Sequence, residues 1–152
     1  MKSRFVLLAA FAVALPLHVD AQSPATKASA VSVTVFKDPN CGCCKDWVEH
    51  LRKHAFKVIA RDTSDMSGIK QSGRIPQQLM SCHTAFVNGY VIEGHVPAED
   101  IKRLLAEKPK IAGLAVAGMP VGSPGMEVGN RKDRYDVIAF NRDGTTSVYA
   151  RH

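Results

Sequence analysis

Residues 31–44 read VSVTVFKDPNCGCC and join a strand pattern to a cluster of cysteines. The first of these residues are mostly β-branched and alternate along the chain, which is typical of a strand buried on one face. Asp38-Pro39-Asn40 then predicts a turn. From residue 43 to about residue 54, apolar side chains recur at three- and four-residue spacing, which predicts a helix. The motif Cys41-Gly42-Cys43-Cys44 is therefore expected at the start of a helix that follows a strand.

The next part of the chain continues a pattern of alternating strands and helices. Residues 56–60 predict a strand parallel to the first, because a helix-length crossover separates the two. The elements expected after it are a short helix over 64–71, a helical turn over 76–80, strands over 84–87 and 90–94 joined by the hairpin turn Asn88-Gly89, and a helix over 98–107. This order predicts an α/β fold of the thioredoxin-like type, with a central mixed sheet flanked by helices.

The C-terminal part has a different character. Residues 114–128 are rich in glycine and proline and cannot form long regular structure. Residues 135–140 and 145–149 are strand-like and flank a turn, so a C-terminal β-hairpin is expected to extend the sheet.

The N-terminus predicts export. A basic start, an apolar run over residues 5–17 and small residues at the −3 and −1 positions indicate a signal peptide over residues 1–21, cut before Gln22. A membrane anchor is the alternative, although the apolar run is shorter than the ~20 residues that span a bilayer. Residues 22–30 are expected to be a flexible leader, and residues 31–152 one domain located in the periplasm.

The charge of the chain does not indicate nucleic-acid binding. The formal net charge is +6, and basic residues alternate with acidic ones without interleaved aromatic side chains. This pattern is typical of a solvated surface.

The cysteine motif itself favours metal binding. Three thiols within four residues are more than one disulfide requires. Backbone N–H groups and the helix dipole stabilise thiolates at a helix start. Gly42 allows Cys41 and Cys43 to face one ion, whereas neighbouring Cys43 and Cys44 diverge and can serve two ions. The motif thus predicts a thiolate-bridged site that holds more than one metal ion.

Two alternatives use the same cysteines. Cys41 and Cys44 have the spacing of a thiol-disulfide oxidoreductase, but Cys43 would interfere with a clean two-electron cycle. A structural module held together by two disulfides is the third interpretation.

Further candidate ligands lie elsewhere in the sequence. Cys82 and His83 precede a predicted strand at the place where thioredoxin-like redox proteins keep a cis-proline, and are expected to close the site. A buried free cysteine beside a surface histidine is the alternative. His95 follows the next strand and is either a ligand or a capping or surface residue. Trp47 is expected to shield the site, and His50 to be a ligand or a helix-surface residue.

Met119 and Met126 are placed in an irregular loop, where a thioether gains little from packing, and are candidate soft ligands. Met66 and Met80 are expected in the core. Thiolates and thioethers select Cu(I), and zinc at the four cysteines is the alternative. Histidine ligands would also accommodate Cu(II), which would permit redox activity.

These motifs together resemble the CopG-type periplasmic copper-resistance proteins from about Val33 to the C-terminus. The resemblance rests on these segments: Cys41-Gly42-Cys43-Cys44 with Trp47 and His50, Cys82-His83-Thr84, Gly94-His95-Val96-Pro97, Gly118-Met119-Pro120 and residues 122–127. It implies a copper-binding, thioredoxin-like protein of copper resistance, and does not supply a reaction. It also implies the metal ligands Cys41, Cys43, Cys44 and Cys82, helped by His83, His95, Met119 and Met126. The implied partners are copper ions and other periplasmic copper-handling proteins, with no nucleic acid and, after signal removal, no membrane.

Overall fold

The computed structural model describes residues 30–152. The expected signal peptide over residues 1–21 and the leader over residues 22–30, apart from Ala30, lie outside the described residues. In chain order the elements are β1 (Ser32–Lys37), α1 (Gly42–Lys53), β2 (Lys57–Asp62), α2 (Met66–Ser72), the 3-10 turn η1 (Gln77–Leu79), β3 (His83–Val87), β4 (Tyr90–Glu93), α3 (Ala98–Glu107), β5 (Gly113–Ala115), β6 (Asp136–Phe140) and β7 (Thr146–Arg151). Among these helices, none is long and apolar enough to cross a bilayer.

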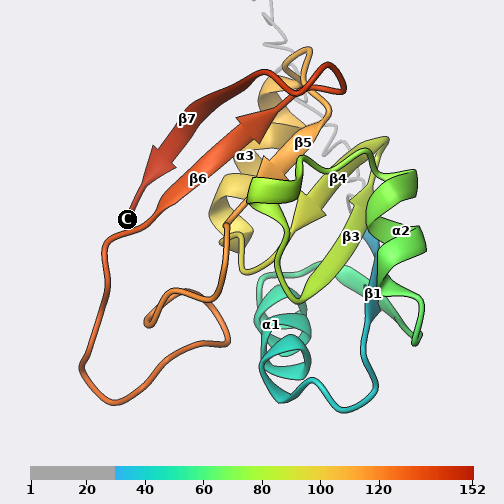
Figure 1. The fold of residues 1–152 in the computed structure, drawn as a ribbon. Helices are drawn as coiled ribbons and strands as arrows, with labels where there is room; N and C mark the ends of the chain where they lie inside the picture. The colour runs from blue at the N-terminus through green and yellow to red at the C-terminus, as the bar shows by residue number, and fades with distance from the viewer. Residues whose placement is uncertain (1–29) are drawn as a thin grey trace, which may run out of the picture.

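The strands form one mixed sheet in the order β2-β1-β3-β4-β5-β6-β7 (Figure 1). β1 pairs in parallel with β2, as the sequence pattern predicts, and antiparallel with β3. The α/β class with a mixed sheet flanked by helices is therefore confirmed. The order of elements up to α3 is compatible with a thioredoxin-like arrangement.

Alternating side chains of the strands point to opposite faces of the sheet, and each face carries its own cluster of buried apolar residues. On one face, Val33 and Val35 of β1 pack with Trp47 and Leu51 of α1, and all four are fully buried. Burial of each such large side chain contributes roughly 1.5–3 kcal/mol. On the other face, a smaller cluster that includes Phe140 of β6 packs against the segment around η1. Helix α1 is therefore held firmly against the sheet.

The topology brings four chain segments to one end of the sheet. β1 ends at Lys37, which pairs with His83 at the start of β3. Thr84 pairs with Glu93 at the end of β4, and Glu93 pairs with Ala115 at the end of β5. The start of α1 follows β1, so the cysteine motif, the segment before β3 and the loops after β4 and β5 all meet there.

The C-terminal hairpin of β6 and β7 extends the sheet as predicted. Residues 113–115 form the short β5, which pairs with both β4 and β6 and was not expected as a separate strand. It is compatible with the prediction that residues 114–128 contain no long regular structure. Tertiary pairing with a strand on either side overrides the weak local propensity.

Candidate metal centre

The cysteine motif lies at the junction of β1 and α1. Cys41 is the N-cap of α1, and its Sγ accepts a hydrogen bond from the backbone N–H of Cys44 at 3.3 Å. A cysteine sulfur is not among the usual capping groups, and this one faces the positive end of the helix dipole. This position favours the thiolate form that binds metal ions and attacks disulfides.

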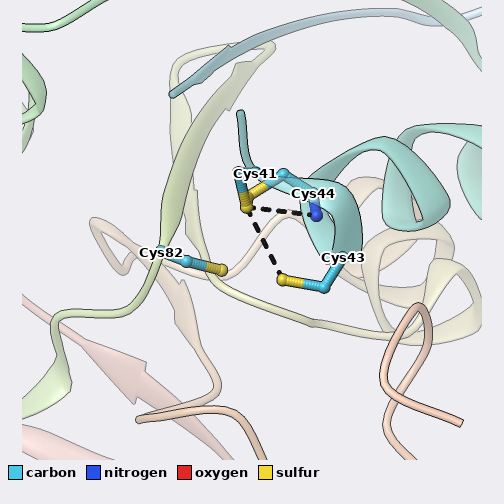
Figure 2. A group of neighbouring side chains, drawn as sticks. All are labelled: Cys41, Cys43, Cys44 and Cys82. Carbon is cyan, nitrogen blue, oxygen red and sulfur yellow. Dashed lines mark hydrogen bonds between the residues drawn. A yellow bond between two sulfur atoms is a disulfide. The ribbon is translucent and has the colours of Figure 1, made fainter. Parts of the chain in front are cut away.

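Four sulfur atoms converge at this point. The Sγ atoms of Cys41, Cys43, Cys44 and Cys82 all lie within 4.8 Å of one another. Figure 2 shows Cys82 reaching from the segment before β3 toward Cys43 on α1. Cys41 and Cys44 form a disulfide, while Cys43 and Cys82 are free thiols. The hypothesis of a module held by two disulfides is therefore wrong, because only one pair is joined.

Two histidines extend the cluster on the side of Cys82. Its Sγ lies 3.1 Å from Nε2 of His95 and 3.3 Å from Nδ1 of His83. Both imidazoles are fully buried, so a surface location, which was the alternative for each, is excluded. His95 Nδ1 lies 2.8 Å from the carbonyl oxygen of Pro124, which can only accept. Nδ1 therefore carries the proton, and Nε2 presents its lone pair to Cys82.

Burial sets the protonation states of this group. Burial lowers the pKa of His95, and it lowers the pKa of His83 to well below the usual range, assisted by nearby His95 and Lys70. Burial and the neighbouring Cys43 raise the pKa of the Cys82 thiol to about 11. The metal-free site thus holds neutral imidazoles beside a protonated thiol, and a bound metal ion would displace the thiol proton.

One buried nitrogen in the cluster has no partner. His83 Nε2 makes no hydrogen bond with any described residue. An unpaired polar atom in the interior costs about 1–3 kcal/mol. Nearby, the indole of Trp47 packs on the His83 ring at 4.4 Å between centroids, and its Nε1–H donates to the carbonyl of Val96. Trp47 thus covers the site, as expected, and Nδ1 of His83, which faces Cys82, is the ring nitrogen available to a metal ion.

The glycine-rich loop, residues 116–134, lies beside α1 (Figure 1). Gly125 has a φ of +83°, and a Cβ there would lie 2.8 Å from both the Cys43 carbonyl oxygen and the Trp47 nitrogen. The next residue, Met126, is therefore close to the start of α1. At the other end of the loop, Ser81 Oγ donates to the carbonyl of Gly118 at 2.5 Å. Met119 follows directly and is 53% exposed. The backbone of the loop thus approaches the segments that carry Cys43 and Cys82, at Gly125 and Gly118.

Two solved structures are similar to this chain over most of its length. Both are named copper resistance protein CopG, as Form 2 and Form 1, and each is 47% identical in sequence. Each match covers 81% of this chain and 98% of the solved chain, with TM-scores of 0.78 and 0.77. The chain belongs to the CopG family of copper resistance proteins.

A family model described as "Protein of unknown function, DUF411" also matches, over residues 79–126. This segment contains Cys82, His83, His95 and both candidate methionines. No curated protein sequence matches the chain. The resemblance to CopG inferred from the motifs is thus confirmed, and the identity of the individual metal ligands stays a prediction.

Two further predictions concern His50, a candidate ligand, and Met80, an expected core residue. His50 Nε2 accepts a hydrogen bond from the backbone N–H of Ala98 at 3.1 Å, so its ring is directed to the start of α3. Met80 is 39% exposed, and the prediction that it lies in the core is wrong. The 3-10 turn η1 ends just before it, which turns the side chain outward, whereas Met66 is partly buried.

A buried ionic network next to the site could not be predicted from the sequence. Glu93 is fully buried, and its Oε1 accepts from Lys70 Nζ at 2.5 Å and from the backbone N–H of Ser81 at 2.6 Å. Its Oε2 accepts from Thr84 Oγ1 at 2.6 Å. Burial raises the pKa of Glu93, opposed by the hydrogen bonds from Lys70 and Thr84. Through Ser81, this carboxylate fixes the backbone that presents Cys82.

Proposed function

We propose that this protein binds Cu(I) in the periplasm as part of copper resistance, through the four cysteines and the histidines beside them. The observation that carries the proposal is the convergence of four sulfur atoms within 4.8 Å of one another. Thiolate sulfur is a soft donor and selects Cu(I) over harder ions. The relatives named copper resistance protein CopG support the choice of copper over zinc.

The arrangement is suited to more than one ion. Cys43 Sγ is 3.5 Å from Cys41 Sγ and also faces Cys82, so it lies between the two sides of the cluster. A thiolate in that position can bridge two copper ions. His83 and His95 would complete the coordination on the side of Cys82, and Met119 and Met126 would add thioether ligands at the solvent side. With histidine ligands the site would also accommodate Cu(II), which permits a redox role.

The disulfide limits when the site can form. Only Cys43 and Cys82 are free while Cys41 and Cys44 are joined. Two electrons and two protons from a thiol reductant would open the bond and provide four sulfur ligands. We expect the reduced protein to be the form that takes up copper and exchanges it with other periplasmic copper-handling proteins.

Anaerobic titration of the reduced protein with Cu(I) against a competing chelator tests the proposal. We expect tight binding of more than one copper ion per chain, and loss of the bridged stoichiometry in Cys43→Ser. For the methionines, Met119→Leu and Met126→Leu are compared with Met80→Leu, which changes an exposed methionine outside the loop. Weak binding by the reduced wild-type protein would sink the copper proposal.

A thiol-disulfide oxidoreductase is the second candidate, favoured by the disulfide at the start of α1. Cys41 is partly exposed and Cys44 is buried, which is the arrangement of an attacking and a resolving thiol. Against it, Cys82 stands before β3 and Cys43 competes for disulfide exchange. The Cys43→Ser variant separates the two functions. An oxidoreductase would keep its insulin reductase activity, whereas a copper site would lose affinity.

A further inference from the structure

A second group of possible metal ligands lies at the opposite end of α1 from the cysteines. His50 and His54 are one helical turn apart, so their side chains share a face, and their rings lie 4.3 Å apart between centroids, tilted by 44°. Glu99, in the first turn of α3, completes the group. One ligand atom from each of the three residues lies within 4.8 Å of the others.

The hydrogen bonds of His54 indicate a cation in this group. His54 Nδ1 lies 2.7 Å from the carbonyl oxygen of His50, which can only accept, so Nδ1 carries a proton. His54 Nε2 then lies 2.9 Å from Oε1 of Glu99, which is a second acceptor. In the neutral imidazole, two lone pairs would face each other across this gap. A proton shared by the two atoms fits this gap, and a metal ion could take its place only by binding both atoms from one side.

His50 directs a lone pair toward the same region. Its Nε2 accepts the N–H of Ala98, the first residue of α3. Burial lowers the pKa of His50, assisted by the charge of His54 and opposed by Glu99 and Glu127, and Lys53 also lowers it. The ring is thus neutral and able to bind a metal ion. Coordination would replace a single 3.1 Å hydrogen bond at the end of a helix.

The surroundings favour a cation that arrives from solvent. The side chains of His54 and Glu99 are 31% and 64% exposed. The group lies at the C-terminal end of α1, where the helix dipole is negative and stabilises positive charge. Asp46, Glu49 and Glu127 line a cavity of about 440 Å³ next to His50, together with Lys53. The local field therefore attracts divalent ions.

We propose that His50, His54 and Glu99 form a second site, which binds a borderline divalent transition-metal ion, Cu²⁺ or Zn²⁺. Two imidazole nitrogens and a carboxylate oxygen suit these ions, whereas Cu(I) prefers sulfur. Among the divalent ions, Cu²⁺ binds such donors most tightly. Helix α1 rises 1.5 Å per residue, so His50 and His54 lie roughly 9 Å and 15 Å along the helix from Cys44. The two sites cannot share one ion.

The chain offers its own matched comparison. His152 Nε2 lies 2.7 Å from Oδ2 of Asp100, so it also pairs with a carboxylate on α3. No second imidazole stands beside this pair in the metal-ligand groups of the described residues. If a histidine-carboxylate pair alone bound the ion, His152→Ala would weaken binding as much as His54→Ala.

Titration of the full chain with Co²⁺ tests the proposal, with Cu(I) loaded first to occupy the thiols. We expect visible d–d absorption without sulfur-to-cobalt charge transfer, and paramagnetic shifts centred on residues 50–54 and 98–99 in ¹H–¹⁵N spectra. His54→Ala and Glu99→Gln should each weaken Co²⁺ binding at least about 10- to 100-fold, the usual cost of losing even an outer partner of a ligand. His152→Ala should leave it unchanged, and Zn²⁺ should displace Co²⁺.

Three results would overturn the second site: no Co²⁺ binding beyond the thiols, equal loss in the His152→Ala variant, or paramagnetic shifts centred on the cysteines. In the first case the gap between His54 and Glu99 holds only a proton. The Cu(I) loading step reports separately on the cysteine cluster. A failure of either site is therefore seen independently of the other.

Discussion

Replacing Glu93 with glutamine should destabilise the protein although glutamine has the same shape. Glu93 is fully buried and is the counter-charge of Lys70, which is 8% exposed. Glu93→Gln would leave the Lys70 ammonium buried without a counter-charge. Removal of one partner from a buried ion pair costs about 3–5 kcal/mol. With a urea m-value of about 2 kcal/mol/M, the unfolding midpoint should fall by about 2 M.

A second variant isolates the cause. In Lys70→Met/Glu93→Gln both charges are absent, so the double variant should be more stable than Glu93→Gln alone. Urea unfolding followed by circular dichroism measures all three proteins. The reasoning is refuted if Glu93→Gln costs less than about 1 kcal/mol, or if the double variant is the least stable. Because Glu93 also holds the Ser81 N–H beside Cys82, the single variant should bind Cu(I) more weakly while it is still folded.

Three other predictions concern the site itself. Gly125→Ala should push the glycine-rich loop away from the Cys43 carbonyl, because the new Cβ would lie 2.8 Å from that oxygen at a φ of +83°. We expect weaker Cu(I) binding with unchanged secondary structure. Unchanged Cu(I) affinity would contradict this prediction. The metal-free protein should lose stability as pH falls below about 6.5. His83 and His95 have lowered pKa values in the folded protein, so the unfolded chain takes up protons first. The free energy of unfolding should fall by up to about 1.4 kcal/mol per histidine and pH unit. Urea midpoints that do not fall between pH 7.5 and pH 5.5 would contradict that prediction. Cys82 should resist alkylation at pH 8, where a pKa of about 11 leaves about one thiol in a thousand ionised. Iodoacetamide labelling of Cys82 can be followed against pH by mass spectrometry. Labelling that reached half its maximum near pH 8.5 would disprove the prediction.

The position of the cysteine cluster could be predicted from the sequence because local and topological rules agree there. Alternation in residues 31–36 and helical spacing after Cys43 set β1 and α1, and Asn88-Gly89 set the β3-β4 hairpin. The hairpin turn has a positive φ at both residues, +46° and +85°, as the dipeptide predicts. Once β3 runs antiparallel to β1, the residue before β3 must lie near the residues that follow β1. This is why Cys82 meets the motif at the start of α1.

The remainder depends on contacts that local pattern does not encode. An acidic residue at a strand end is usually exposed, so nothing in the sequence distinguishes Glu93 as the centre of a buried network. His50 has helical spacing from the cysteines, but the position of α3 decides that its ring contacts Ala98 instead. β5 pairs with strands on both sides despite a glycine-rich sequence. In each case tertiary packing determines the outcome, and periodicity carries no information about it.

The disulfide and the copper cluster compete for the same atoms, and this links the two candidate functions. Cys41 and Cys44 cannot be joined to each other and also provide two thiolates to copper. Any ion that binds only the reduced form stabilises that form by mass action, by about 4 kcal/mol when the free ion exceeds its dissociation constant a thousandfold. For a two-electron couple this corresponds to about 90 mV, which makes the disulfide easier to reduce. Copper and thiol redox state would therefore each control the other, so the two proposed functions, disulfide reduction and copper binding, would belong to two states of one cluster.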